Sequence, residues 1–400
     1  MKTRKLVSLM LVLAMALFSF SVAMAEEDVI QLGSLVGVSG QAPEIGIAME
    51  RGFMTAVEEI NAAGGIQGRT LNYQNYDIQN SDTRMAIDGY TYLTQEAGCV
   101  AIMGPAVSNV GLALIDYAAD YEVPLVGLWI NVACTHDEND VPYPYMYLAQ
   151  PTNNNMAEIM AAYMIEKGQN KVALLYNSQQ AYHTSQVDAF RAYCESHGVE
   201  IVSDQPYTDQ TMDFASILTV IRDSGAECIY APQDAVTGAI ILSTLDSLGM
   251  MDEGMVIYGD VNYSAPWTNL LPDKTVANNI YFPLNVDSSD EKLISLAETY
   301  LSKWDDCQTQ EQINVKYYLG YDIAQTIFQA IDICITEGLE VTGPNVNACL
   351  EKASYDGVTG RIAFSETSHQ STHDECMLYV YQLEKGEYNC LGSYVYSQLQ

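Results

Sequence analysis

Positive charge is scarce in this sequence. Its 17 lysine and arginine residues face 51 aspartate and glutamate residues, giving a formal net charge of -34. A surface of that sign repels nucleic acid phosphates and anionic lipid headgroups, so we expect neither as a partner. The same charge favours a soluble chain with little self-association, and we predict a monomer.

The common catalytic motifs are also missing. The sequence has no phosphate-binding G-x-x-x-x-G-K-[ST] loop, no G-x-S-x-G nucleophile elbow and no H-E-x-x-H zinc motif. Gly33, Gly37 and Gly40 lack the spacing of a dinucleotide-binding loop. We therefore predict that the chain is not an enzyme and that it holds no cofactor.

Metal and redox pairs are absent as well. None of the nine cysteines forms a C-x-x-C pair, and Cys99, Cys228 and Cys334 lie in apolar runs that favour buried, reduced thiols. Disulfides stay open as an alternative, because they form in exported proteins, but the odd number leaves at least one cysteine unpaired. His369 and His373 lie in a Ser/Thr/Asp-rich segment, where two solvated loop histidines are expected rather than a metal site.

The first 25 residues have the pattern of a secretory signal peptide. Three basic residues precede the apolar run from Leu6 to Phe20, which ends before Ala23-Met24-Ala25. We predict cleavage between Ala25 and Glu26; an uncleaved membrane anchor is the alternative. No cysteine follows the site to carry a lipid anchor, and cleavage changes the net charge from -34 to -37.

From Asp28 onwards, short apolar runs alternate with amphipathic stretches, a pattern typical of β-α units around a parallel sheet. In the first half we expect strands at 29–36, 71–77, 99–103 and 124–129, and helices at 44–63, 82–97 and 108–120. After a turn-rich stretch the pattern restarts, with strands at 171–176, 200–205 and 227–231 and helices at 154–166, 184–196, 214–223 and 235–248. Later helices are expected at 291–303 and 315–336, and strands at 280–284, 361–364 and 376–383. The length and the restart predict two α/β domains.

The loop from Gly104 to Asn109 lies where a strand ends and a helix begins. In open α/β folds, ligands bind at such places, where helix N-termini present free N–H groups. A serine or asparagine there is most often only a helix cap, and that interpretation stays open for Ser108.

Several segments resemble one known family in order and spacing. These are INAAGGIQG (60–68), IMGPAVSN (102–109), VPLVG (123–127), KVALLYNSQQAY (171–182) and TMDFASILTVIRDSGAECIY (211–230). Together they resemble the type I periplasmic binding proteins of branched-chain amino acid (leucine/isoleucine/valine) transporters, over nearly the whole mature chain.

This resemblance implies an α/β fold of two doubly wound parallel-sheet lobes joined by a three-crossover hinge. Lobe I would comprise 26–149, completed by about 285–366, and lobe II 150–284, completed by about 367–400. A ligand would lie between the lobes, and their closure would be recognised by the transporter's membrane permease.

The resemblance also implies a set of ligand-binding residues. Ser108, with Asn109 and the neighbouring N–H groups, would hold a ligand carboxylate, and Asn131 stands where the family usually has threonine. Tyr182 would cover the ligand from the second lobe, and Asp260 would pair with a ligand ammonium, unless it only caps a turn. The set is completed by Ile45 on the first lobe and by Gln233 or its neighbour Asp234 on the second.

Two departures from the family pattern put branched-chain specificity in doubt. Trp129 stands where the family has small polar residues, and it would either stack on a planar ligand or fill space as part of the core. His183 replaces the glycine that usually follows the tyrosine.

We therefore predict an exported solute-binding protein that captures an amino acid or related small ligand for an ABC importer. The alternatives are a binder of amides, urea-type or aromatic acid ligands, and a sensor of the same fold.

Overall fold

The computed structural model describes residues 29–40, 43–79, 82–129, 131–260, 267–371 and 377–396. The predicted signal peptide lies outside these ranges, as do Cys376 and His373. No helix in the described ranges combines the length and the apolarity needed to cross a bilayer.

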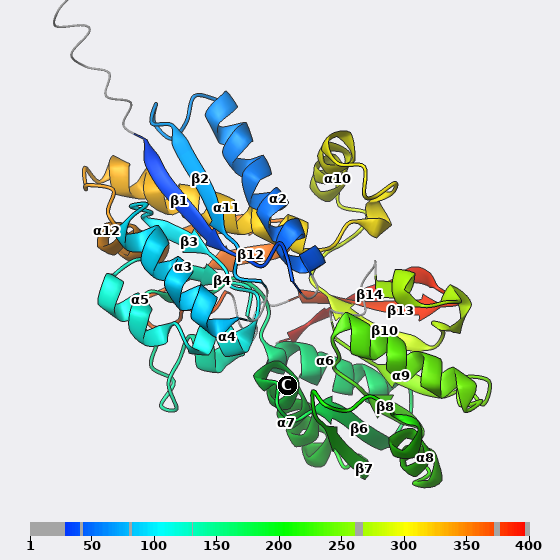
Figure 1. Ribbon diagram of the computed structural model, residues 1–400. Coiled ribbons are helices and arrows are strands. Elements are labelled where there is room, and N and C mark those ends of the chain that lie inside the picture. The colour runs from blue at the N-terminus through cyan, green and yellow to red at the C-terminus, as the bar shows by residue number, and fades with distance from the viewer. Residues whose placement is uncertain are drawn as a thin grey trace, which may run out of the picture.

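The chain folds into two α/β lobes, seen at upper left and lower right in Figure 1. The sheet of lobe I is wholly parallel, in the order β2-β1-β3-β4-β5. Its strands are β1 (Ile30–Leu35), β2 (Leu71–Tyr76), β3 (Ala101–Met103), β4 (Leu125–Gly127) and β5 (Met146–Leu148). The helices between them are α2 (Pro43–Ala62), α3 (Thr83–Gln95), α4 (Ser108–Leu112) and α5 (Ile115–Tyr121).

Lobe I has a hydrophobic core on each face of its sheet. Successive side chains of β3 alternate between these cores: Ala101 and Met103 join the core that includes α2, whereas Ile102 joins the core that includes α3. A strand buried on both faces needs apolar residues at every position, which explains why β3 is a continuous apolar run.

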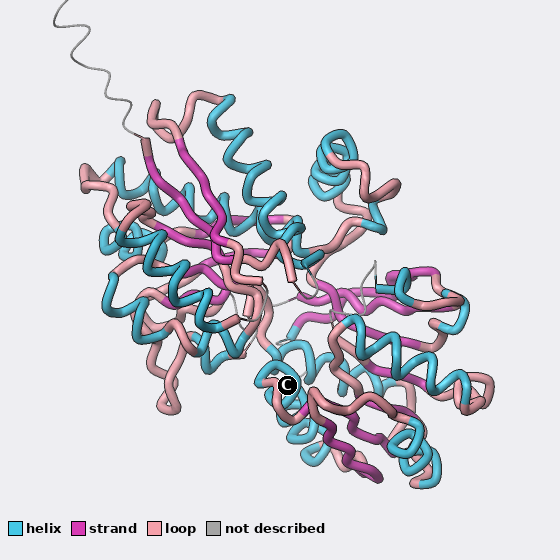
Figure 2. Tube along the Cα trace, viewed as in Figure 1, coloured by secondary structure: helices cyan, strands magenta, loops and turns pink. Residues whose placement is uncertain are grey.

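The sheet of lobe II has the order β14-β13-β10-β9-β8-β6-β7, in which β13 and β14 are antiparallel to their neighbours. Its strands are β6 (Lys171–Asn177), β7 (Glu200–Tyr207), β8 (Cys228–Tyr230), β9 (Val256–Tyr258), β10 (Ile280–Leu284), β13 (Met377–Glu384) and β14 (Glu387–Val395). The helices are α6 (Asn153–Glu166), α7 (Ala181–Ser196), α8 (Ala215–Asp223) and α9 (Ala235–Ser247). Figure 2 shows helices on both sides of the strands in each lobe, as in a doubly wound fold.

The chain passes between the two sheets three times: after β5, after β10 and before β13. The first and third crossovers lie side by side, because Leu148 N donates to His369 O at 2.8 Å and Ser371 N donates to Leu148 O at 2.8 Å. This confirms the predicted fold class, a three-crossover pair of α/β lobes.

Between the second and third crossovers lie α10 (Glu291–Lys303), α11 (Lys316–Thr336), α12 (Gly343–Leu350) and the hairpin of β11 (Ser354–Gly357) and β12 (Gly360–Ala363). The helix α11 packs on α2 and β3 of lobe I. Glycines permit the close approach: a Cβ on Gly52 would overlap Tyr317 O, and one on Gly320 would overlap Met49 O.

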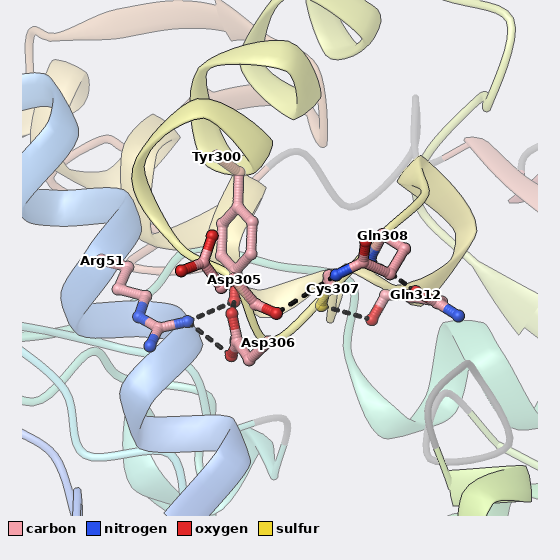
Figure 3. A network of polar contacts seen from close by, with 7 residues as sticks. All are labelled: Arg51, Tyr300, Asp305, Asp306, Cys307, Gln308 and Gln312. Atoms are coloured by element: carbon pink, nitrogen blue, oxygen red, sulfur yellow. Dashed lines mark hydrogen bonds and ion pairs between the residues drawn. The ribbon is translucent and has the colours of Figure 1, made fainter.

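A polar network fastens α10 and the segment after it to α2 (Figure 3). Arg51 Nη1 lies 2.6 Å from Asp306 Oδ2 and donates to Tyr300 OH at 2.5 Å, while its guanidinium lies 4.9 Å from the Trp304 ring centroid. The turn after α10 is closed by Gln308 N, which donates to Gln312 Oε1 at 2.7 Å. One arginine of α2 thus holds three residues of the returning segment.

The single helix predicted at 108–120 is wrong, because the structure divides it into α4 and α5. Ala113 N and Leu114 N donate to residues three positions earlier, Val110 O and Gly111 O, so the α-helical pattern breaks between the two helices. Gly111 lies against a large ring: a Cβ there would be 2.8 Å from Trp129 Cε3. The break between α4 and α5 thus lies two residues beyond this contact with the Trp129 ring.

Candidate ligand-binding site between the lobes

Tyr182 and Asp260, both predicted from the sequence, are brought together by the fold. Tyr182 lies in the first turn of α7, after β6, and Asp260 follows β9. The Tyr182 hydroxyl donates a hydrogen bond to Asp260 Oδ2, and the Asp260 side chain has no exposed surface. Burial, and then the Asp260 charge, raise the pKa of Tyr182 well above its ordinary value, so its hydroxyl stays a donor at neutral pH.

Asn109 and Asn131 extend from lobe I to the start of α7 in lobe II. Asn109 Oδ1 accepts from Ala181 N at 3.3 Å, and its Nδ2 donates to Gln180 Oε1 at 3.3 Å. Asn131 Nδ2 donates to Ala181 O at 3.3 Å, while its Oδ1 accepts from Ala133 N and caps η1 (Val132–Cys134). These two predicted residues therefore bridge the lobes beside Tyr182.

Polar atoms without protein hydrogen bonds lie on the same two helices. Ser108 Oγ on α4 and His183 Nδ1 on α7 are both buried, and neither has a hydrogen-bond partner among the described residues. The helices α4 and α7 contact each other. Burial lowers the pKa of His183 to about 4, against the opposing effects of Asp234 and Asp209, so its imidazole is neutral at pH 7. Unsatisfied buried polar atoms are costly, and a polar ligand would satisfy them.

A charged residue that the sequence analysis missed lies near this site. Lys316, at the start of α11, is 9% exposed, and its Nζ donates to Gln150 Oε1 at 3.0 Å. Gln150, in the first crossover, donates through Nε2 to Leu128 O. Burial lowers the pKa of Lys316 to about 8, against the opposing effect of the Asp260 charge. The available signal was a lysine inside the apolar run from Val315 to Leu319, on a helix face that must be buried.

The structure places Trp129 in the core of lobe I. Its side chain is fully buried, packing against Gly111, Gly127 and Cys134. Its Nε1 has no hydrogen-bond partner among the described residues. Of the two roles open from the sequence, the structure supports packing, because glycine on α4 and on β4 leaves the volume that the ring fills.

The remaining predicted residues contact protein groups within one lobe. Gln233 is buried in lobe II, where it accepts from Tyr207 OH and donates to Leu175 O at 2.9 Å. Asp234 is exposed and caps α9 by accepting from Thr237 N at 2.9 Å. Ile45 is half-buried against the core of lobe I.

The prediction of a solvated His369 is wrong. This side chain is 4% exposed and stacks on Tyr147 at 4.1 Å between ring centroids. Its Nδ1 lies 2.9 Å from Tyr143 O, and burial lowers its pKa to about 4. The histidine packs where the third crossover runs beside β5, which its polar sequence neighbours did not reveal. In the described part of the chain, no three His, Cys, Asp or Glu side chains gather as a metal site would require.

Two α/β lobes joined by three crossovers have the fold of the type I periplasmic binding proteins. The sequence model described as periplasmic binding protein matches residues 29–387. The chain therefore belongs to the periplasmic binding protein family.

Individual relatives are distant. The Leu/Ile/Val-binding protein homolog 3 of Brucella melitensis is 22% identical over 349 residues, covering 86% of this chain and 89% of its own. The branched-chain amino acid transporter substrate binding protein LivJ of Streptococcus pneumoniae, solved with isoleucine, superposes with a TM-score of 0.79 at 23% identity, over 92% of this chain and 99% of its own. An R. palustris ABC transporter solute binding protein solved with 4-hydroxybenzoate gives 0.76 at 17% identity, over 92% and 97%. At these identities the structural likeness shows the fold alone.

Proposed function

We propose that this chain captures a small amino acid or a related organic acid between its two lobes and delivers it to the membrane permease of an ABC importer. The observation that carries the proposal is the buried Tyr182–Asp260 pair, which lies on the same side of lobe II as the two asparagine bridges from lobe I. Ser108 Oγ and His183 Nδ1 add buried polar atoms that a ligand would satisfy.

The relatives support a small organic acid as the ligand, and they do not distinguish an amino acid from an aromatic acid. LivJ was solved with isoleucine and the R. palustris protein with 4-hydroxybenzoate, which share a carboxylate. The burial of Trp129 favours neither isoleucine nor 4-hydroxybenzoate as the ligand, because the ring packs within the core of lobe I. The protein would bind the solute without converting it.

A thermal-shift screen over amino acids, their amides, ureas and aromatic acids tests the binding function. A ligand that binds only the native state raises the unfolding midpoint as its concentration increases. We expect amino acids or aromatic acids to do so. A folded chain whose midpoint moves with none of these classes would overturn the proposal.

Small-angle scattering tests the two-lobed capture itself. We expect a monomer with lobe limits near residues 149, 285 and 366. Its radius of gyration should fall when it is saturated with the solute identified in the screen. An unchanged radius at saturation would contradict closure of the lobes on the solute.

Export is the third part of the proposal. The mature protein would begin at Glu26 after cleavage behind Ala25. Mass spectrometry of the secreted product checks this, and a membrane-bound chain starting at Met1 would contradict it.

A further inference from the structure

Lys316 is a buried cation with more N–H donors than it has acceptors among the described residues. Its ammonium carries three N–H donors, and among the described residues Gln150 Oε1, at 3.0 Å, is the acceptor that the structure gives to Nζ. At 9% exposure, water has little access to the other donors. An ammonium in this state lacks partners that water or an anion would supply elsewhere.

Lys316 lies between groups of lobe I and groups of lobe II. Gln150, which accepts its hydrogen bond, reaches Leu128 O at the end of β4 in lobe I. On the other side, Val315 and Tyr317, which flank Lys316, pack in the hydrophobic core that includes Tyr258 of β9, the strand that Asp260 follows in lobe II. In keeping with this, the Asp260 charge raises the lysine pKa. Lys316 thus lies where the lobes meet, near the hydrogen-bonded Tyr182–Asp260 pair.

We propose that Lys316 is a specificity-determining residue that binds an anionic group of the captured solute, a carboxylate. This rests on the proposed function and deepens it, because it assigns the solute a negative charge and names the side chain that receives it. A carboxylate offers two oxygens to the unused donors, and in a buried site a charge-assisted bond of this kind exceeds a neutral one. A solute that also carries an ammonium would balance Asp260 at the same time.

A proton-linked signal follows from this placement. Burial is the larger effect and lowers the pKa of Lys316 to about 8, whereas the Asp260 charge opposes it by favouring the protonated form. Tyr182 and His183, on the lobe II side of the site, are neutral at pH 8.5, since the pKa of the first is raised and that of the second is about 4. A bound carboxylate would raise the pKa of Lys316, so binding at pH 8.5 would take up part of a proton.

Calorimetric titration with matched acid and amide probes tests the proposal. The probes are isoleucine with isoleucinamide and 4-hydroxybenzoate with 4-hydroxybenzamide, titrated at pH 6.5, where both α-amino groups of the first pair are mainly protonated and each pair differs in the carboxylate. For the pair that binds, we expect the wild type to prefer the acid by about 30-fold or more. Lys316→Met should abolish that preference, and Lys316→Gln serves if the methionine variant folds poorly. Lys171→Met, at an exposed lysine, is the control.

Proton uptake on binding, measured at pH 8.5 in buffers of different ionisation enthalpy, distinguishes two roles of Lys316. Uptake is expected if Lys316 contacts the solute carboxylate, but not if it only stabilises the fold. We expect uptake in the wild type and in Lys171→Met, and none in Lys316→Met. Uptake that persists in the variant would overturn the proposal, as would an equal loss of acid and amide binding, which indicates that Lys316 only supports the fold or neutralises Asp260. If a folded wild type binds amides but not acids, the inference fails and solute capture stands. If it binds none of the four probes and nothing in the thermal-shift screen, the proposed function fails and the inference with it.

Discussion

The hydroxyl of Tyr182 donates its hydrogen bond to a carboxylate of Asp260 that has no exposed surface. A buried carboxylate with a neutral donor still needs a positive charge nearby to offset its lost hydration. Lys316 supplies part of that charge from the structure, and a solute ammonium would supply more. The pair therefore connects the geometry of the site to the charge of its ligand.

Replacement of Asp260 by asparagine tests this connection. If the solute carries an ammonium, Asp260→Asn should weaken its binding by a few kcal/mol, because the cation would be buried without a counter-charge. Isoleucine and 4-hydroxybenzoate, titrated in a calorimeter, distinguish an ammonium-bearing solute from a plain acid. Asp234→Asn, at the exposed cap of α9, is the matched control. Equal affinity of Asp260→Asn and wild type for an ammonium ligand would remove Asp260 from the site.

Truncation of Trp129 should reduce stability and leave binding intact. Trp129→Ala leaves a cavity between α4 and β4, and loss of a fully buried tryptophan costs about 3–5 kcal/mol. Urea unfolding measures the loss, and Trp304→Ala, at a half-buried position, should cost less. A variant of native stability with weakened ligand binding would show instead that the ring contacts the solute.

The strongly patterned elements were predictable from the sequence. The helix predicted at 291–303 has the bounds of α10, because a regular apolar stripe follows Asp290, whose carboxylate caps the first turn. The helix predicted at 44–63 differs from α2 by one residue at each end. Periodicity and capping are local properties, so they can be found without knowledge of the fold.

Short or exposed elements were missed. The strands β5 and β9 have three residues each, too few to show a period, and α12 has eight. The strand β14 pairs only with β13, at the edge of its sheet, and exposed polar residues interrupt its apolar pattern. Tertiary pairing defines these elements, and the sequence alone contains little trace of it.

Contacts among the candidate site residues were predictable in part. The contact of Tyr182 with Asp260 joins residues 78 positions apart, so only the family resemblance placed them together. The family resemblance did not indicate a role for Lys316, and it did not reveal the glycines that leave space for Trp129. Both depend on the packing of side chains from separate segments, which local patterns do not record.

Loss of Arg51 should loosen the segment from α10 to Gln312. The ion pair with Asp306 is half exposed and the ring contact with Trp304 is modest, so Arg51→Met should cost about 1 kcal/mol of global stability. The larger effect should be faster hydrogen exchange of amides in that segment, measured by mass spectrometry. Arg222→Met, which removes a more exposed pair with Asp223, is the control. Unchanged exchange in the Arg51 variant would show that the core alone holds the segment.

His183 should make the free protein less stable in mild acid. Burial keeps its pKa at about 4 in the folded chain, whereas an unfolded histidine titrates near 6.5, so the unfolded state binds more protons between these values. The contribution is present above about pH 6.5 and is lost as the pH falls toward 4. From pH 7.5 to 5.0 we expect His183 to account for about 1–2 kcal/mol of lost unfolding free energy.

Urea unfolding at the two pH values, compared between wild type and His183→Gln, isolates this amount, because other titrating groups cancel in the difference. Among these is Asp322, whose buried carboxyl has a pKa raised to about 6 and acts in the opposite direction. His197→Gln, at an exposed histidine, should behave as the wild type does. The same pH dependence in wild type and His183→Gln would mean that the folded chain protonates His183 freely, and that its imidazole is open to water rather than buried beside Tyr182.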